Sequence, residues 1–154
     1  FITNLFEPLT FILLSFLVIF YLFFKERNRE ALFFLITTSL AFILGNLVKI
    51  VMQRTRPDNI LVLEKTFSFP STHALMAVIF FGMLVYLLEI HIRSSFKKTI
   101  LTIFATLATL IMGLTRIILN AHWFTDVIGG FTLGVFLICA FLILIKKEHL
   151  LKVN

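Results

Sequence analysis

Five long apolar stretches dominate this sequence of 154 residues and decide what it can fold into. Most are close to the roughly 20 residues that a helix needs to cross the hydrocarbon core of a bilayer. None alternates with the two-residue period of a membrane β-strand, and backbone groups in lipid need internal partners. The sequence therefore predicts an all-α, polytopic transmembrane helical bundle with five spans, approximately Phe6–Phe24, Ala31–Met52, Thr72–Leu88, Ile100–Leu119 and Trp123–Ile145.

The composition agrees with a membrane protein. Hydrophobic residues make up 60% of the chain, charged residues 14%, and the mean hydropathy is +1.05, whereas soluble domains are roughly 45–50% apolar and 25% charged. The length suits a single domain over residues 1–154. The net charge of +6 does not indicate a nucleic-acid partner, because the cations lie between apolar segments. Cys139 lies in an apolar run and is expected to be a buried small hydrophobe.

The Lys and Arg residues predict the orientation of the bundle. Nine of the 14 fall in the first connection, the third connection and the tail, namely Lys25, Arg27, Arg29, Arg93, Lys97, Lys98, Lys146, Lys147 and Lys152. An excess of Lys and Arg marks the cytoplasmic side. The other five lie on the extracytoplasmic face, where function rather than topology is expected to keep them: Lys49, Arg54, Arg56, Lys65 and Arg116.

The same orientation places Phe1 outside the cytoplasm, although no cleavable signal sequence precedes it. We therefore expect a further span before Phe1, which would give six spans in the full-length protein.

The first cluster of polar residues ends the second apolar stretch. Lys49, Gln53 and Arg56 are spaced by four and three residues, so they share one face if the helix continues to its end at Pro57. An ionised group at the bilayer centre costs roughly 2.5–3.5 kcal/mol, and phosphate is the anion that best suits Lys and Arg together. Snorkelling of Lys49 and Arg56 toward water explains this pair equally well.

The second cluster is Pro70-Ser71-Thr72-His73, which opens the third apolar stretch. Ser71 or Thr72 can act as the helix N-cap, and the free backbone N–H groups of such a helix start bind phosphate readily. His73 would lie beside that anion. Taken alone, the cluster is explained more simply as a capped helix with an interfacial histidine.

The third cluster joins the last two stretches. Thr115-Arg116 ends the fourth, Asn120 is a plausible N-cap for the fifth, and His122 and Asp126 lie four residues apart on one face. A carboxylate that accepts a proton from one imidazole nitrogen leaves the other nitrogen as a nucleophile or base. The alternative is an interfacial pair that anchors the helix, which suits Asp126 less well because it lies one turn inside an apolar span.

Together the three clusters resemble the type-2 phosphatidic acid phosphatase family, whose motifs are Lys-x6-Arg-Pro, Pro-Ser-Gly-His and Ser-Arg-x5-His-x3-Asp. Lys49 to Pro57 matches the first in full. Pro70-Ser71-Thr72-His73 matches the second with Thr72 in place of glycine, and Thr115 to Asp126 matches the third with Thr115 in place of serine. Order and spacing agree over residues 49–126.

The resemblance implies a role for each matching residue. His122 would attack phosphorus and form a phosphohistidine, Asp126 would orient it, and His73 would protonate the leaving alkoxide. The phosphoryl oxygens would be held by Lys49, Arg56, Ser71, Thr72 and Arg116. We expect no cofactor and no metal, because the sequence has no Asp/Glu cluster to hold Mg²⁺. Glycine at position 72 would let the backbone approach the phosphate without a Cβ, so Thr72 brings the local geometry and full activity into question.

The function that the resemblance implies is hydrolysis of a lipid phosphate or diphosphate at the extracytoplasmic face of the cell membrane. Candidate substrates are phosphatidylglycerol phosphate, phosphatidic acid and undecaprenyl diphosphate. Phe67, Phe69 and Leu61-Val62-Leu63 either guide a lipid tail or seat their loop in the interface. The expected partners are the bilayer and the lipid substrate, with no obligate protein partner.

Two other functions stay open at this point. A catalytically impaired protein that binds or transports lipid phosphates would carry the same motifs. Vanadate-dependent haloperoxidases share the motif set too, but they are generally soluble, which five predicted spans oppose.

Overall fold

The computed structural model describes residues 8–58, 61–62, 64 and 66–151, which form five helices and no strand. The helices are α1 (Pro8–Phe24), α2 (Asn28–Met52), α3 (Thr72–Glu89), α4 (Ser95–Ile118) and α5 (Phe124–Leu151). The all-helical transmembrane prediction is therefore confirmed, with each helix close to its predicted bounds. Four of them, α2 to α5, are long and apolar enough to cross a membrane, whereas the apolar part of α1, Thr10–Phe24, is shorter.

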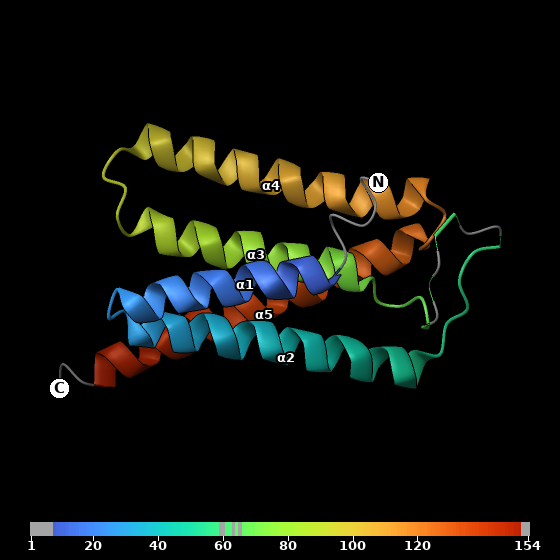
Figure 1. The fold of residues 1–154 in the computed structure, drawn as a ribbon, viewed down its shortest axis with the longest axis horizontal. Coiled ribbons are helices and arrows are strands. Elements are labelled where there is room, and N and C mark those ends of the chain that lie inside the picture. The colour runs from blue at the N-terminus through green and yellow to red at the C-terminus, as the bar shows by residue number, and fades with distance from the viewer. Residues whose placement is uncertain (1–7, 59–60, 63, 65, 152–154) are drawn as a thin grey trace.

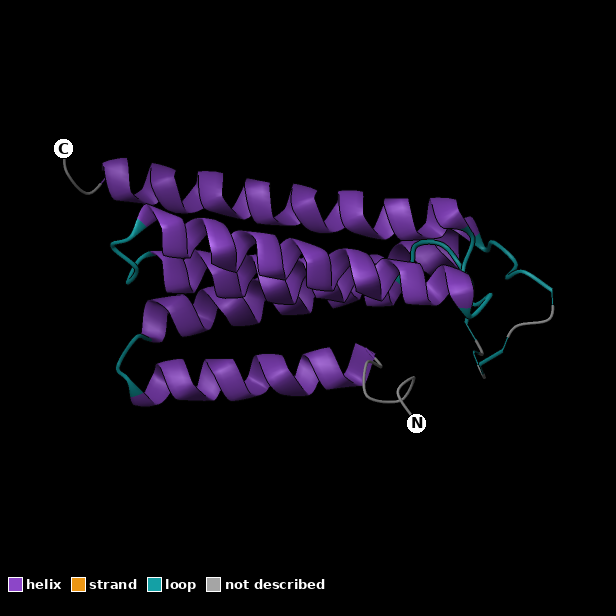
Figure 2. Ribbon diagram, turned by 90° about the horizontal axis from the view of Figure 1, so that it is seen from above, coloured by secondary structure: helices purple, strands orange, loops and turns teal. Residues whose placement is uncertain are grey.

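The helices lie lengthwise beside one another, so that their connections gather at two ends (Figure 1, Figure 2). The α1–α2 and α3–α4 connections share one end with the C-terminal end of α5. The α2–α3 and α4–α5 connections share the other end. All three motif clusters fall at this second end, which we call the site end.

Helix α3 forms the centre of the bundle and packs against each of the other four helices. Its residues 72–80 are all buried, and Leu75, Met76 and Ile79 form the apolar core together with Phe34 of α2. The outward faces of the other helices expose large apolar side chains, as expected of a surface in contact with lipid. Cys139 is exposed on such a face, so the prediction that it is buried is wrong: an apolar run in a membrane helix does not separate core from lipid-facing positions.

Glycines let α5 approach α3 closely. A Cβ added at Gly130 would lie 2.5 Å from the backbone oxygen of Ser71, and one added at Gly134 would lie 2.7 Å from Cβ of Val78. Small residues spaced by four allow this kind of backbone contact between membrane helices. The contact at Gly130 holds the start of α3 against the first turns of α5.

Candidate active site

Helix α2 ends at Met52, where the predicted span ends, so it does not continue to Pro57 as a shared face of Lys49 and Arg56 would require. Gln53 takes the left-handed conformation (φ 45°), and its N–H donates to the carbonyl oxygen of Lys49 over 3.0 Å. The segment from Gln53 to Pro57 is therefore non-helical, and Lys49 and Arg56 do not share a helix face. They reach the site from different backbone directions, so helix spacing predicted their proximity for the wrong reason.

Both cations are held by neutral backbone carbonyls. The Nζ of Lys49, a residue only 4% exposed, donates to the carbonyl of Phe67 over 2.7 Å. Arg56 donates from Nε to the carbonyl of Thr66 over 2.8 Å and from Nη1 to that of Ala121 over 2.7 Å. Burial lowers the pKa of the Arg56 guanidinium from its ordinary value, yet arginine stays protonated in proteins. These carbonyls hold the two side chains in place without cancelling their positive charge.

The start of α3 is built as predicted, with Ser71 as N-cap. Its Oγ accepts from the N–H of Ala74 over 3.5 Å, and its own N–H donates to the backbone oxygen of Asp126 over 2.9 Å. Ser71, Thr72 and His73 are all buried. The first turn of α3 is thus fixed to α5, with its N-terminal end at the site end of the bundle.

His73 lies against Arg116, the last basic residue of α4. The Nη1 of Arg116 is 3.0 Å from Nε2 of His73, and both residues are buried. Because a guanidinium only donates, Nε2 accepts and the ring hydrogen is assigned to Nδ1. The second and third motifs therefore meet through a direct contact.

The α4–α5 connection corrects a second prediction. Asn120 follows α4 in the left-handed conformation (φ 52°), four residues before α5 begins at Phe124, so it is not the N-cap of α5. Asp126 provides a side-chain acceptor at the start of α5 instead, because its Oδ2 accepts from the N–H of Trp123 over 2.9 Å. The carboxylate that was predicted to orient His122 therefore also caps the helix.

His122 and Asp126 form the expected pair. Nδ1 of His122 is 3.5 Å from Oδ2 of Asp126, and both side chains are almost fully buried. Nε2 faces the other way, 3.3 Å from Nη1 of Arg56. Burial lowers the pKa of His122 below its ordinary value, and the nearby carboxylate offsets part of this effect. A neutral imidazole whose Nε2 carries no hydrogen is the form that can act as a nucleophile.

Arg54 is a site residue that the sequence reasoning did not single out. Its Nη1 donates to Oδ1 of Asp126 over 2.8 Å and to Oγ1 of Thr125 over 2.6 Å, and its guanidinium lies over the Trp123 ring at 5.6 Å. Asp126 thus has a cation on one oxygen and His122 near the other. The sequence feature that could have identified Arg54 was its place among the five cations assigned to the extracytoplasmic face.

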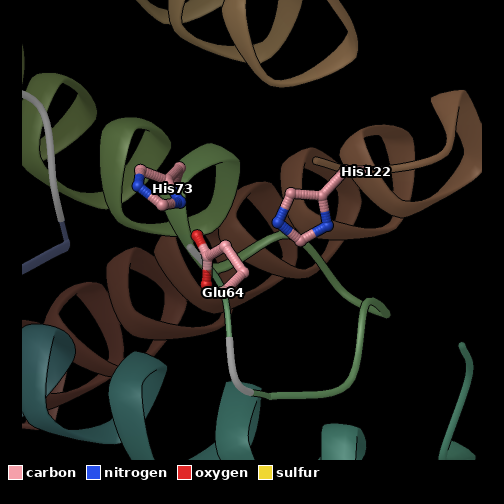
Figure 3. A group of neighbouring side chains, drawn as sticks. All are labelled: Glu64, His73 and His122. Carbon is pink, nitrogen blue, oxygen red and sulfur yellow. The ribbon is translucent and has the colours of Figure 1, made fainter. Parts of the chain in front are cut away.

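Glu64 is the second residue that was missed. Figure 3 shows its side chain reaching between His73 and His122, and the ligand atoms of the three residues all lie within 4.8 Å of one another. Oε2 of Glu64 is 3.2 Å from Nη2 of Arg56. Two histidines and a carboxylate can hold a transition metal. The cations around them, Lys49, Arg56 and Arg116, oppose a divalent cation and favour an anion in the same space.

A cavity of about 480 Å³ opens beside this cluster, between the end of α2 and the following loop. Lys49, Arg54, Arg56 and Glu64 contribute to its walls. The predicted lipid-guiding segment is only partly visible, because Leu63 lies outside the described residues. Phe69 packs on α5, where a Cβ at Gly129 would lie 2.5 Å from its ring. This contact favours the alternative that Phe69 seats the loop.

The chain is similar to known proteins in sequence and in fold. The family model of the PAP2 superfamily matches residues 30–150. Phosphatidylglycerophosphatase B of Bacillus subtilis (strain 168) is 35% identical over 119 residues, which are 75% of this chain and 58% of that protein. The chain thus spans little more than half the length of this relative.

A crystal structure described as the first transmembrane PAP2 type phosphatidylglycerolphosphate phosphatase from Bacillus subtilis matches with a TM-score of 0.85 and 30% identity. The match covers 95% of this chain and 74% of the other. The sequence motifs, the helical bundle and all three comparisons lead to one assignment. The chain belongs to the PAP2 superfamily.

Proposed function

We propose that this protein is an integral-membrane phosphatase that removes phosphate from a lipid headgroup at the extracytoplasmic face of the cell membrane. The observation that supports it most is the meeting of Lys49, Arg56 and Arg116 around two buried histidines, one of which is backed by a buried carboxylate. Phosphatidylglycerol phosphate is the first substrate to test, because the curated relative is named a phosphatidylglycerophosphatase. Phosphatidic acid and undecaprenyl diphosphate are the other candidates.

In the first step Nε2 of His122 attacks phosphorus. A P–N bond forms and the P–O bond to the lipid breaks. His73, which takes up a proton when the phosphate binds beside it, gives a proton to the leaving oxygen and returns to the neutral imidazole. Asp126 accepts a hydrogen bond from the Nδ1–H of His122 and stabilises the positive charge that grows on the ring. The 3.5 Å between Nδ1 and Oδ2 is long for a hydrogen bond, and such contacts often shorten when substrate binds.

Charge neutralisation provides most of the rate enhancement in this mechanism, as in phosphoryl transfer generally. Lys49, Arg56 and Arg116 would hold the phosphoryl oxygens, and their positions are fixed in advance by hydrogen bonds to the protein. Ser71 and Thr72 would add hydroxyl donors and the N–H groups of the α3 start. These fixed cations would do the work of a metal ion, so we propose a metal-independent reaction.

In the second step water attacks the phosphohistidine. His73, which lost its proton in the first step, accepts one from the water, the P–N bond breaks, and inorganic phosphate leaves. The site end is proposed to face away from the cytoplasm, because the three positively charged regions lie at the opposite end of the bundle.

The test is phosphate release from a panel of lipid phosphates by the purified chain, with and without EDTA. We expect turnover that EDTA does not reduce, competitive inhibition by vanadate, and inactivation by His122→Ala. His91, an exposed histidine at the opposite end of the bundle, provides the matched control: His91→Ala should keep full activity. Vanadate binding without turnover of any lipid phosphate would instead support the lipid-binding alternative.

A further inference from the structure

A second cleft, of about 660 Å³, lies between α3 and α4. Its walls are almost wholly apolar and include Phe81 of α3 with Phe104, Leu107 and Ala108 of α4. Phe104 and Leu107 are 67% and 53% exposed, so the cleft opens on the surface that faces lipid. Its volume falls within the roughly 300–1,000 Å³ of ordinary ligand sites.

The polar end of this cleft belongs to the candidate active site. Thr115 and Arg116, at the C-terminal end of α4, are its polar lining residues. Arg116 also contacts His73 over 3.0 Å. Arg116 therefore borders both the apolar cleft and the proposed phosphate site, and an anionic group beside Arg116 could have an apolar chain extending along α4.

The length of the cleft suits one lipid chain. Phe104 and Arg116 are twelve residues apart on one helix, which corresponds to about 18 Å at 1.5 Å per residue. The hydrocarbon core of a bilayer is about 30 Å thick, so one leaflet measures about 15 Å. A chain lying in the cleft would keep the depth that it has in the leaflet while its headgroup stays at the site end.

We propose that the α3–α4 cleft binds the hydrocarbon chain of the lipid whose phosphate is held by Arg116. This inference rests on the proposed function, and it places the chain along α4 rather than along the loop before α3. A neighbouring protein helix could cover the same apolar side chains. It would gain nothing from the buried cation at the end of the cleft, whereas an amphiphile with an anionic head matches both parts.

The experiment measures binding of butyl, octyl and dodecyl phosphate to the full chain in detergent. Each CH2 that enters the cleft contributes about 0.8 kcal/mol at most, or about fourfold in affinity. Ala108→Phe should fill part of the cleft, so its loss of affinity should grow with chain length and exceed tenfold for dodecyl phosphate. Leu107→Trp blocks the same cleft and replaces Ala108→Phe if that variant does not fold.

Thr106→Phe is the matched control, because Thr106 is an exposed small residue of α4 that does not line the cleft. It should bind all three compounds as the parent chain does. Equal losses for all chain lengths in Ala108→Phe, or equal losses in both variants, would overturn the proposal. So would a change from dimer to monomer in Ala108→Phe without any chain-length effect, which would assign the cleft to a second copy.

Binding also separates this inference from the proposed function. Chain-length-dependent binding without hydrolysis would refute only the phosphatase assignment. Hydrolysis of long-chain lipid phosphates with no difference between Ala108→Phe and Thr106→Phe would refute only the cleft.

Discussion

Removing each histidine in turn should separate the nucleophile from the proton donor. His122→Ala leaves no group in position to form the phosphoenzyme, so we expect no turnover on any substrate. His73→Ala removes only the proton for the leaving group, a contribution of about 10²–10⁴-fold. That loss should be severe for alkyl phosphates and small for p-nitrophenyl phosphate, whose leaving group needs no proton.

The structure adds a complication that decides the choice of variants. His73 accepts a hydrogen bond from Arg116 over 3.0 Å inside the protein, and a buried donor left without its partner costs about 1–3 kcal/mol. His73→Ala would therefore disturb Arg116 as well as remove the acid. His73→Gln keeps an acceptor for Arg116 but has no titratable proton. We expect both variants to lose far more activity on alkyl phosphates than on p-nitrophenyl phosphate, while only His73→Ala also raises KM.

The assay is kcat and KM for an alkyl phosphate and for p-nitrophenyl phosphate, with each histidine variant. Asp126→Asn should fall between His73→Gln and His122→Ala on alkyl phosphates, because it keeps the shape of the side chain but loses the charge beside His122. The reasoning would be refuted by activity in His122→Ala together with a His73 variant that is inactive on both substrates. In that case the two histidines would exchange roles.

Four further outcomes follow from the local geometry. Thr72→Gly should change turnover by less than tenfold, about 1.4 kcal/mol; a complete loss would make the Thr72 hydroxyl a primary phosphate ligand. Arg54→Gln should lower kcat about tenfold with little change in KM, because Asp126 loses its 2.8 Å partner, and Arg54→Lys should restore part of it. Gly130→Ala should reduce the stability by about 1–3 kcal/mol, measured as a lower thermal midpoint, because its Cβ would lie 2.5 Å from a backbone oxygen of α3. The acid limb of kcat/KM should lie below pH 6.5, the ordinary histidine value, because burial lowers the pKa of the His122 nucleophile, which must be neutral to react.

The helices were predictable because most of the apolar stretches are long enough to cross a bilayer, and because the composition is too apolar for a soluble domain. The meeting of the motifs was predictable because alternate connections of such a bundle share one end. The left-handed turn that follows α2 was not predictable, because no glycine or proline marks Gln53, and a left-handed residue there is stabilised by its bond to Lys49. The cap of α5 was missed because Asp126 reaches back to Trp123, while Asn120 had the residue type expected of an N-cap.

Arg54 and Glu64 could not have been placed from the sequence, because their roles depend on contacts across the fold. Arg54 and Asp126 are separated by 72 positions in the chain. Only the packing of the α2–α3 loop against α5 brings them together. Glu64 resembles any acidic loop residue, such as Asp58, until the loop carries it between the two histidines. Helix periodicity predicts only which residues are neighbours within one or two turns of the same helix. It does not predict contacts between a loop and a distant helix.

The partners of the buried cations explain why this end of the bundle attracts an anion. A lysine or arginine paired with a carboxylate presents little net charge, and Arg54 is of that kind, because Asp126 accepts from it. Lys49 instead donates to a neutral carbonyl, as does Arg56 in three of its bonds. Glu64 is the one described carboxylate that meets Arg56, and it stands where the proposed phosphate would lie. A doubly charged phosphate in that place would neutralise more of the buried positive charge than Glu64 does, so substrate binding should move Glu64 aside.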